Sequence, residues 1–382
     1  MIVGVLAEQK SSEQRVALTP GGVRALTQGG HGVVLQSGAG VPARFADEEY
    51  IQAGARVVYA PDEVFGRAAL LLKMSALRTD EIEKLSPEQT VMAFHHLAAS
   101  PRETVSRLLA REVTLIGFEV IEDRKGDLPV LHAISEIAGQ LSVHVAAHLL
   151  ETRAGGRGIL LGGATGIPPA HVVILGAGVV GLWAAKTAVG NRAQVTLLDT
   201  SLPALRQAEE ALGRNVITEV AHPHSVARAA AYADALIGAV LVRGEKAPHV
   251  VTREMVQAMK PGSVIIDVSI DQGGCVATSR PTTAEDPVFV EAGVVHYAVP
   301  NMTSAVARTA SLALTHAALP YLLAIAERGV AGAIRDQQGL AAGVYTYRGQ
   351  MVYQPLARAF GLPCDPLIEL VGSPDYPDNI YA

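Results

Sequence analysis

Cysteine and aromatic residues are scarce in this chain of 382 residues. The two cysteines, Cys275 and Cys364, cannot form a disulfide framework or a paired zinc motif, so a reducing compartment is the simplest inference. Aromatic residues make up 4% of the chain and show no pattern of a base-stacking platform. These scarcities argue against a disulfide-rich secreted protein and against a binder of single-stranded nucleic acid.

Charge is also sparse, and long hydrophobic runs are few. Charged residues make up 18% of the chain and the net charge is −6, which argues against nucleic acid as the main partner. The segment after Met1 lacks the charged start of a signal peptide. The uncharged stretch Val172–Ala185 is too short and too rich in glycine to span a bilayer, which needs about 20 apolar residues. We therefore expect a cytoplasmic protein with no nucleic-acid or membrane partner.

The first 130 residues alternate strand-like and helix-like patterns. Helices are predicted at Gly21–Thr27, with Thr19 as N-cap and Pro20 at the first helical position, and at Pro101–Ala110. Because strands that alternate with helices form mostly parallel sheets, this part of the chain should be α/β. The predicted strands are Ile2–Leu6, Gly32–Gln36, Arg56–Tyr59, Ala69–Met74, Thr90–Phe94 and Thr114–Val120.

A dinucleotide-binding fingerprint follows later in the chain. The β-branched run Val172–Leu175 leads into Gly176-x-Gly178-x-x-Gly181, which opens a predicted helix at Val179–Gly190. In such motifs the first glycine permits a tight turn, the second lets the backbone approach a pyrophosphate, and the third lets helix pack on strand. The anion would lie at the helix N-terminus, where free N–H groups favour negative charge.

The next predicted strand, Gln194–Leu198, ends in Asp199. A carboxylate at this place accepts a hydrogen bond from a ribose 2′-hydroxyl and repels a 2′-phosphate, so the predicted cofactor is NAD. The competing interpretation is a glycine-rich turn in some other α/β protein.

Two long predicted helices, Ser135–Arg153 and Ser304–Arg328, bracket this nucleotide-binding segment. We therefore predict an α/β protein of two Rossmann-like, doubly wound parallel-sheet domains linked by long helices. Residues 1–132 and 304–382 would form a discontinuous substrate domain, and residues 133–303 the NAD-binding domain. Ligands of such sheets bind beyond the carboxyl ends of the strands, so the active site is expected in the cleft between the domains.

Polar residues stand where several predicted strands end. Arg15 suits bidentate capture of a carboxylate, although taken alone it reads more readily as a surface residue. Lys73 ends an apolar run, with snorkelling of its side chain as the alternative. His96, next to His95, is a candidate acid or base, and packing is its alternative. Asp271 follows the apolar run Val264–Asp267, and a solvated loop is its alternative.

A set of short motifs occurs in order along the chain: Arg15, Leu70-Leu-Leu-Lys73, His96-Leu-Ala-Ala99, Ser135-Glu136-x-Ala138-Gly139, Gly155-Gly-Arg-Gly158, Ile237-Gly-Ala-Val-Leu241, Lys246-Ala-Pro248, Asp271-Gln-Gly-Gly-Cys275, Ser279-Arg-Pro-Thr-Thr283 and Asn301-Met302. The set resembles the bacterial L-alanine dehydrogenase family over nearly the whole chain, to about residue 362. It is less similar to the related transhydrogenase α subunit.

The resemblance implies NAD-dependent, reversible oxidative deamination of L-alanine to pyruvate and ammonia. Arg15 and Lys73 would hold the carboxylate and carbonyl oxygen of pyruvate, His96 would be the acid and base, and Asp271 would help to activate water or position the imine. The family is also expected to assemble as a homohexamer, and no metal is implied. The residues expected to line NAD are Ser135, Gly176, Gly178, Val180, Gly181, Asp199, Val240, Leu241, Ile270, Asp271, Asn301 and Met302.

One departure from the family pattern lies beside the expected substrate. The family usually continues from the lysine as Lys-x-Lys-Glu-Pro, whereas this chain has Lys73-Met-Ser-Ala-Leu77. A related enzyme acting on another amino acid, such as an opine-type or lysine-type dehydrogenase, is therefore an open alternative. A non-catalytic NAD-binding sensor is a third, against which the presence of Arg15, Lys73, His96 and Asp271 argues.

Overall fold

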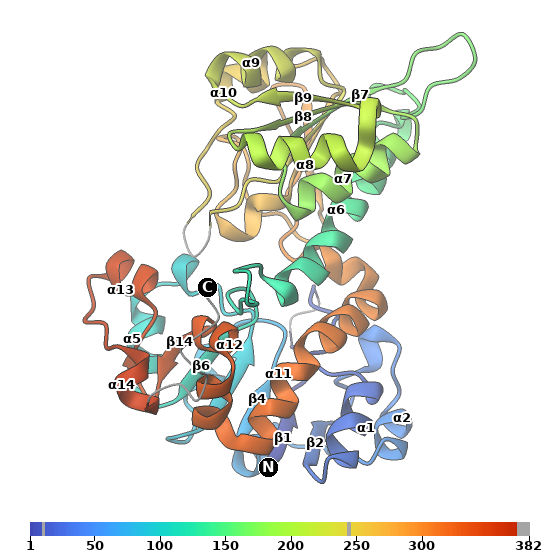
Figure 1. Ribbon diagram of the computed structural model, residues 1–382. Coiled ribbons are helices and arrows are strands. Elements are labelled where there is room, and N and C mark those ends of the chain that lie inside the picture. Colours follow the sequence, from blue (N-terminus) through green and yellow to red (C-terminus); the bar gives the residue numbers. More distant parts are fainter. Residues whose placement is uncertain (10–11, 243–245, 373–382) are drawn as a thin grey trace. The chain divides into compact units, whose positions relative to one another are not determined.

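The structure is a computed structural model that describes residues 1–9, 12–242 and 246–372 (Figure 1). The chain divides into two compact units. Unit 1 contains Met1–Ile134 and the chain from Ser304 onward, and unit 2 contains Ser135–Thr303. The first passage between the units lies within the long helix α6 (Pro129–Leu149), close to the predicted division at residues 132 and 133, and the return lies within the 3₁₀ helix η6 (Met302–Val306).

Unit 1 is built on an eight-stranded sheet with the order β15-β14-β6-β5-β4-β1-β2-β3. Strands β1 to β6 pair in parallel, and β14 adds to β6 in the antiparallel direction. All six strands predicted in this part of the chain are present, and β14 and β15 were not predicted. The strands are β1 (Ile2–Val5), β2 (Gly32–Gln36), β3 (Arg56–Val58), β4 (Leu70–Leu72), β5 (Thr90–Ala93), β6 (Thr114–Gly117), β14 (Val344–Tyr347) and β15 (Gln350–Met351).

The helices of unit 1 follow from local sequence. Thr19 has the extended backbone of an N-cap residue ahead of Pro20, but its side chain makes no capping bond; its N–H instead donates to Thr315 Oγ1 at 3.0 Å. The helices are α1 (Pro20–Gln28), η1 (Val41–Ala43), α2 (Asp47–Gln52), α3 (Pro61–Arg67), α4 (Thr79–Ile82), η2 (Leu97–Ala99), α5 (Arg102–Ala110), α11 (Ala307–Asp336), α12 (Gln338–Ala342), α13 (Gln354–Phe360) and α14 (Leu367–Val371).

Unit 2 is built on a seven-stranded sheet with the order β12-β13-β11-β10-β7-β8-β9, parallel except for the hairpin of β12 and β13. The strands are β7 (His171–Leu175), β8 (Gln194–Asp199), β9 (Val216–Val220), β10 (Ala235–Gly238), β11 (Val264–Asp267), β12 (Val288–Glu291) and β13 (Val294–Tyr297). The helices are η3 (Thr152–Ala154), α7 (Val179–Gly190), α8 (Leu202–Leu212), η4 (Gly213–Asn215), α9 (Pro223–Tyr232), α10 (Arg253–Gln257) and η5 (Val268–Gln272).

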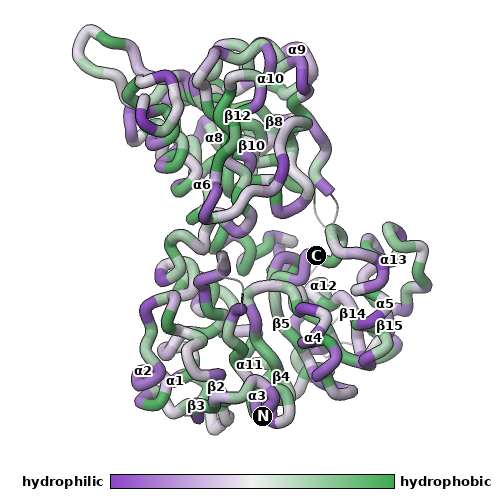
Figure 2. Tube along the Cα trace, turned by 180° about the vertical axis from the view of Figure 1, so that it is seen from behind, coloured by the Kyte–Doolittle hydropathy of each residue, from purple (hydrophilic) through white to green (hydrophobic). Residues whose placement is uncertain are grey.

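The central strands β7, β10 and β11 of unit 2 are almost entirely apolar, because both faces of the sheet are covered there. Val172 and Ile174 of β7 belong to one buried cluster, and Val173 and Leu175 belong to another. Parallel strands buried on both faces read as continuous hydrophobic runs rather than alternating ones. Figure 2 shows the contrast between buried strands and a surface helix: β5 and β10 are mostly hydrophobic, and α4 is mostly hydrophilic. The predicted α/β class with two Rossmann-like parallel sheets is confirmed.

The two long helices differ from their predicted bounds. α6 begins at Pro129 rather than Ser135 and ends at Leu149, while α11 begins at Ala307 and continues to Asp336 through a kink at Gly329. Proline at the first helical position is favourable, because its missing N–H has no partner there in any case.

The segment Met302–Asp336 is long and apolar enough, by length and composition, to cross a membrane. It is longer than the uncharged stretch Val172–Ala185, which is too short to span a bilayer. Within unit 1, however, Leu314 and Leu322 of α11 are completely buried, and Ser311 Oγ accepts a hydrogen bond from the N–H of Val16 at 2.9 Å. Buried core helices pass the same composition test, and α11 packs as one of them.

Candidate active site

The three predicted substrate residues of unit 1 lie at one edge of its sheet. Strands β1, β4 and β5 are adjacent and parallel, so their carboxyl ends meet at the same edge. Lys73 follows β4 directly, His96 follows β5, and Arg15 belongs to the segment between β1 and α1. In open α/β sheets, ligands bind beyond this edge.

Lys73 is buried rather than snorkelling. Its side chain is 2% exposed, and its Nζ donates to Glu8 Oε2 at 2.8 Å and to Ser75 Oγ at 2.9 Å. Glu8 also accepts from the N–H of Met74 at 2.8 Å and from the Ser75 hydroxyl. A second carboxylate, Glu81 Oε2, lies 3.6 Å from Nζ. The lysine is thus held rigidly, with its charge balanced.

Arg15 was expected at the surface when taken alone, and this expectation is wrong. Its side chain is 2% exposed and donates from Nε to Glu13 Oε1 at 2.7 Å and from Nη2 to Glu13 Oε2 at 2.6 Å. The N–H of Arg15 donates to the same carboxylate at 3.1 Å. A bidentate pair of this kind fixes both position and orientation of the guanidinium.

His95 and His96 have different surroundings. His95 is 1% exposed and its Nε2 lies 3.3 Å from the carbonyl oxygen of Val91. Burial lowers the pKa of the His95 imidazole, which is a packed, neutral side chain. His96 is half-buried, its ring stacks on Phe94 with centroids 6.0 Å apart, and its backbone is left-handed with φ 47° and ψ 41°. Of the two histidines, His96 is thus the one whose side chain is partly exposed.

The glycines of the fingerprint in unit 2 have three separate roles. Gly176 has φ 104°, and a Cβ there would overlap the carbonyl oxygen of Ala239. A Cβ at Gly181 would overlap the carbonyl oxygen of Gly176, so α7 could not begin so close to β7. At Gly178 a Cβ would meet no atom within 4 Å, so the backbone at the start of α7 faces open space. An open backbone at a helix N-terminus is suited to binding an anion.

Asp199 ends β8 and is tied to the fingerprint loop. Its Oδ2 accepts from the N–H of Ala177 at 2.6 Å, and its Oδ1 accepts from the N–H of Ser201 at 2.7 Å. The carboxylate therefore lies beside the glycine-rich turn, as an acid that binds the ribose of NAD must. Val180 follows one residue into α7 and is half-buried.

The other predicted cofactor residues of unit 2 follow β10, β11 and β13. In the sheet, β10 lies next to β7, β11 lies next to β10, and β13 lies next to β11. Asp271 lies in η5, not in a free loop, and its Oδ1 accepts from the N–H of Asn301 at 2.8 Å. Asn301 has a left-handed backbone with φ 54°. The remaining residues are Val240 (half-buried), Leu241 (50% exposed), Ile270 (6% exposed), Met302 (6% exposed) and, on α6, Ser135 (half-buried).

A buried carboxylate at the end of β11 shapes the loop that carries Asp271. Asp267 is 2% exposed, and its Oδ2 accepts from the N–H groups of Cys275 and Val276 at 3.1 and 3.3 Å. Burial raises the pKa of the Asp267 carboxyl above its ordinary value, against the opposing effect of these hydrogen bonds.

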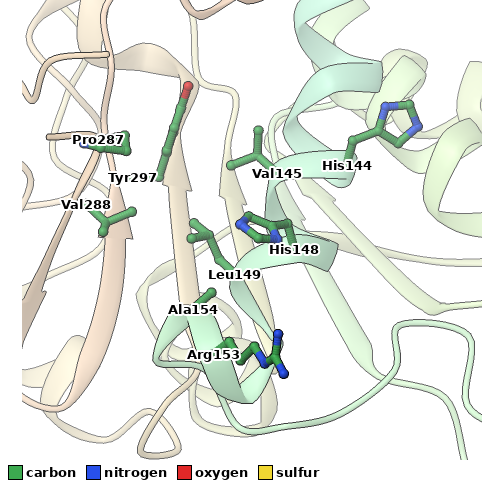
Figure 3. Close-up of a pocket in the computed structure, with 9 residues that line it drawn as sticks. All are labelled: His144, Val145, His148, Leu149, Arg153, Ala154, Pro287, Val288 and Tyr297. Carbon is green, nitrogen blue, oxygen red and sulfur yellow. The ribbon is translucent and has the colours of Figure 1, made fainter. Parts of the chain in front are cut away.

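A pocket of unit 2 lies apart from these residues (Figure 3). Figure 3 shows His148 and Arg153 from the end of α6 and from η3, opposite Val288 and Tyr297 of the β12–β13 hairpin. No predicted site residue lines it. Among residues 1–9, 12–242 and 246–372, no group of three or more His, Cys, Asp or Glu side chains is placed to hold a metal ion.

The sequence analysis missed three acidic partners of the predicted site residues: Glu8 beside Lys73, Glu13 beside Arg15, and Glu119, whose Oε1 accepts from the N–H of His96 at 2.8 Å. Glu8 follows β1 as Lys73 follows β4, and Glu119 follows β6 as His96 follows β5. These glutamates could have been paired with Lys73 and His96 only from knowledge of which strands are neighbours. That knowledge requires the strand order of the whole sheet.

Comparison with known proteins gives a consistent family. Sequence profiles of the N-terminal and C-terminal domains of the alanine dehydrogenase/PNT family match residues 4–138 and 142–354. The chain is 42% identical over 367 residues to an alanine dehydrogenase of Methanococcus maripaludis, covering 96% of this chain and 98% of that one. It is 43% identical to an alanine dehydrogenase of Bacillus subtilis, covering 94% of this chain and 95% of the relative.

Solved structures agree with the sequence comparisons. An L-alanine dehydrogenase structure matches with a TM-score of 0.88 and 41% identity, covering 94% of this chain and 99% of that one. A transhydrogenase from Sinorhizobium meliloti matches with a TM-score of 0.76 and 27% identity, covering 92% of this chain and 99% of that one. On these matches, which span nearly its whole length, the chain belongs to the alanine dehydrogenase/PNT family.

Proposed function

We propose that this protein is an NAD-dependent alanine dehydrogenase, which converts L-alanine reversibly to pyruvate and ammonia. The observation that carries the proposal is the placement of two buried cations, Arg15 and Lys73, and the half-buried His96 at one edge of the unit 1 sheet. The near-full-length similarity to alanine dehydrogenases supports the same reaction.

Unit 1 is the substrate domain in this proposal. Arg15 binds the carboxylate of alanine or pyruvate, because its guanidinium carries more N–H donors than the bidentate pair with Glu13 uses. Lys73 donates to the carbonyl oxygen of pyruvate. Their partners Glu13 and Glu8 hold both cations in place before substrate arrives, which is the positioning that brings a reacting carbon into line.

Unit 2 is the NAD-binding domain. The open side of Gly178 at the N-terminus of α7 fits a pyrophosphate, and Asp199 fits the ribose hydroxyls. Bound NAD supplies the acceptor for the hydride that leaves Cα of alanine. Ser135, Gly176, Val180, Gly181, Val240, Leu241, Ile270, Asp271, Asn301 and Met302 complete the proposed cofactor site.

His96 carries the proton transfers. The ammonium group of alanine loses a proton before hydride leaves Cα, and the water that attacks the resulting iminium loses another. An imidazole is suited to both transfers, because its ordinary pKa lies near neutral pH. Asp271, held by the N–H of Asn301, helps to activate this water or to position the imine.

A second candidate is the same chemistry on another amino acid. The loop after Lys73 departs from the family pattern, and in the structure Met74 is completely buried while Ser75 donates to Glu8. Where the family pattern has a second lysine, this chain places a hydroxyl in the same network. A changed side-chain preference would arise here, with the mechanism retained.

Assembly and location complete the proposal. We propose a homohexamer, as the family resemblance implies, and light scattering of the purified chain measures its mass directly. The proposed location is the cytoplasm, as the sequence analysis expects. The activity is tested by NADH formation, followed at 340 nm, with NAD and a panel of L-amino acids. Turnover with alanine supports the leading proposal, and turnover with another amino acid alone supports the second candidate.

A further inference from the structure

The backbone of His96 is held in an unusual conformation by a side chain outside its own strand. His96 lies in the left-handed region, which few residues other than glycine adopt and which persists only where the surroundings enforce it. Its N–H donates to Glu119 Oε1 at 2.8 Å. Since β5 and β6 pair in parallel with Ala93 opposite Gly117, the segments after both strands leave the sheet together.

Glu119 is itself held by a residue from the far end of the chain. The hydroxyl of Tyr345, on β14, donates to the same Oε1 at 2.9 Å. Glu119 is 6% exposed and Tyr345 is 3% exposed. Burial, and next to it the charge of Glu119, raise the pKa of the Tyr345 phenol well above its ordinary value, so the hydroxyl keeps its proton and donates.

The backbone of β6 and β14 leaves room for the contact between Glu119 and Tyr345. The pairing of β14 with β6 is irregular between Val344 and Thr346, and such irregularities redirect a side chain. Tyr345 lies at that irregularity. A Cβ at Gly117 would overlap the Tyr345 ring and lie 3.0 Å from Glu119 Oε2, so glycine makes room for both side chains. Glu119 Oε2 is buried and makes no hydrogen bond within the described chain.

We propose that Glu119 is a positioning residue for His96. Its carboxylate, oriented by Tyr345, fixes the left-handed backbone of His96 and so aims the imidazole at the substrate. Glu119 acts through the main chain of His96 and does not touch the reacting atoms. This inference rests on the proposed function, in which His96 moves the protons.

The test is a double-mutant cycle on the full-length chain, with NADH formation from alanine as the readout. Glu119→Ala should lower kcat/KM on the order of 10²-fold, the loss expected when a reacting group is misplaced by about 1 Å, with the change mainly in kcat. In a His96→Ala background the same substitution should change the residual rate by no more than about twofold. A change of that size lies within the deviation from additivity found for mutations at independent sites.

Two conservative variants and one control refine the cycle. Glu119→Gln keeps an oxygen that accepts from the His96 N–H and should recover most of the lost rate. Tyr345→Phe should lose rate several-fold by freeing the carboxylate. The control is Tyr50→Phe, which removes another buried phenol of unit 1, bonded to the carbonyl oxygen of Leu18 at 3.0 Å. It should lower stability without changing kcat.

Three results would overturn the inference: an unchanged rate in Glu119→Ala, an equal loss in the His96→Ala background, or an equal loss in Tyr50→Phe. If the unaltered chain turns over no amino acid, the proposed function fails instead. The inference is then decided by the imidazole NMR signals of His96 in ¹⁵N-histidine-labelled protein. These should shift in Glu119→Ala and stay in place in Tyr50→Phe, and unmoved signals in both would reject it.

Discussion

The ammonium Nζ of Lys73 lies 2.8 Å from Glu8 Oε2, and both side chains are less than 5% exposed. Removing one partner of a buried pair leaves an uncompensated charge in a dry environment, which costs about 3–5 kcal/mol. We therefore expect Lys73→Met to lower the free energy of unfolding by about this amount in urea titrations.

The control for Lys73→Met is Arg67→Met. It breaks the ion pair of Arg67 with Glu63, whose side chains are 39% and 41% exposed. An exposed pair is worth less than about 1 kcal/mol, so this variant should unfold almost as the parent does. Equal losses in both variants would contradict the buried pairing.

The fingerprint glycines predict opposite outcomes for the same substitution. Gly181→Ala should destabilise unit 2 by about 1–3 kcal/mol, because the new methyl overlaps the carbonyl oxygen of Gly176. Gly178→Ala should cost about 1 kcal/mol or less, because no atom lies within 4 Å of the new methyl and alanine is only a poorer N-cap for α7, and it should weaken NADH binding. Thermal unfolding and NADH fluorescence titration separate the two effects. Unweakened NADH binding in Gly178→Ala would remove this glycine from the proposed phosphate cradle.

Asp199 should determine the choice between NAD and NADP. Replacing it with asparagine removes the charge that repels a 2′-phosphate, so the ratio of kcat/KM for NAD over NADP should fall about tenfold. Asp234→Asn is the matched control. Asp234 accepts from the N–H of His171 at 2.9 Å, at the amino end of β7, where no cofactor contact is proposed. A ratio that falls equally in both variants, or in neither, would contradict this role.

The buried imidazole of His95 should make stability depend on pH. Burial lowers its folded pKa, against the charge of Glu119, which raises it, while the charge of His96 lowers it further. The unfolded chain therefore binds more protons below pH about 6.5, and stability present above that pH is lost as the pH falls toward the folded pKa. The slope approaches about 1.4 kcal/mol per pH unit for one proton.

His95→Gln should reduce this slope, because glutamine can replace the contact to the carbonyl oxygen of Val91 without titrating. His249→Gln, at an exposed position, should leave it unchanged. Urea unfolding at pH 7.5, 6.5 and 5.5 measures all three slopes. A slope that persists in His95→Gln would place the proton uptake elsewhere, with the buried His296, whose pKa burial also lowers, as the next group to replace.

The nucleotide-binding half was predictable because its signals are local. The helix predicted at Val179–Gly190 is present with the same bounds, and the strand predicted before Asp199 differs only in including it. A positive φ at Gly176 and the start of a helix at Val179 depend on residues next to each other in the sequence. The cofactor type, NAD, followed from one acid at the end of a strand.

The surroundings of the proposed catalytic groups were not predictable in the same way. Glu8 meets Lys73 because β1 and β4 are neighbours, and that order is set by the packing of the whole sheet. Tyr345 reaches Glu119 from β14, a strand that was not predicted although its residues favour strands, and its place next to β6 in the sheet is set by long-range pairing. Arg15 read as a surface residue because its partner Glu13 gave no signal of burial.

The central claim is tested most directly by adding L-alanine and NAD to the purified chain at alkaline pH and following absorbance at 340 nm, with His96→Ala alongside. We expect alanine-dependent NADH formation that the substitution lowers about 10²- to 10⁴-fold, to a small residual rate. NADH formation at close to the parent's rate in His96→Ala would remove this residue from the mechanism. NAD binding without turnover of any amino acid would contradict the proposed dehydrogenase.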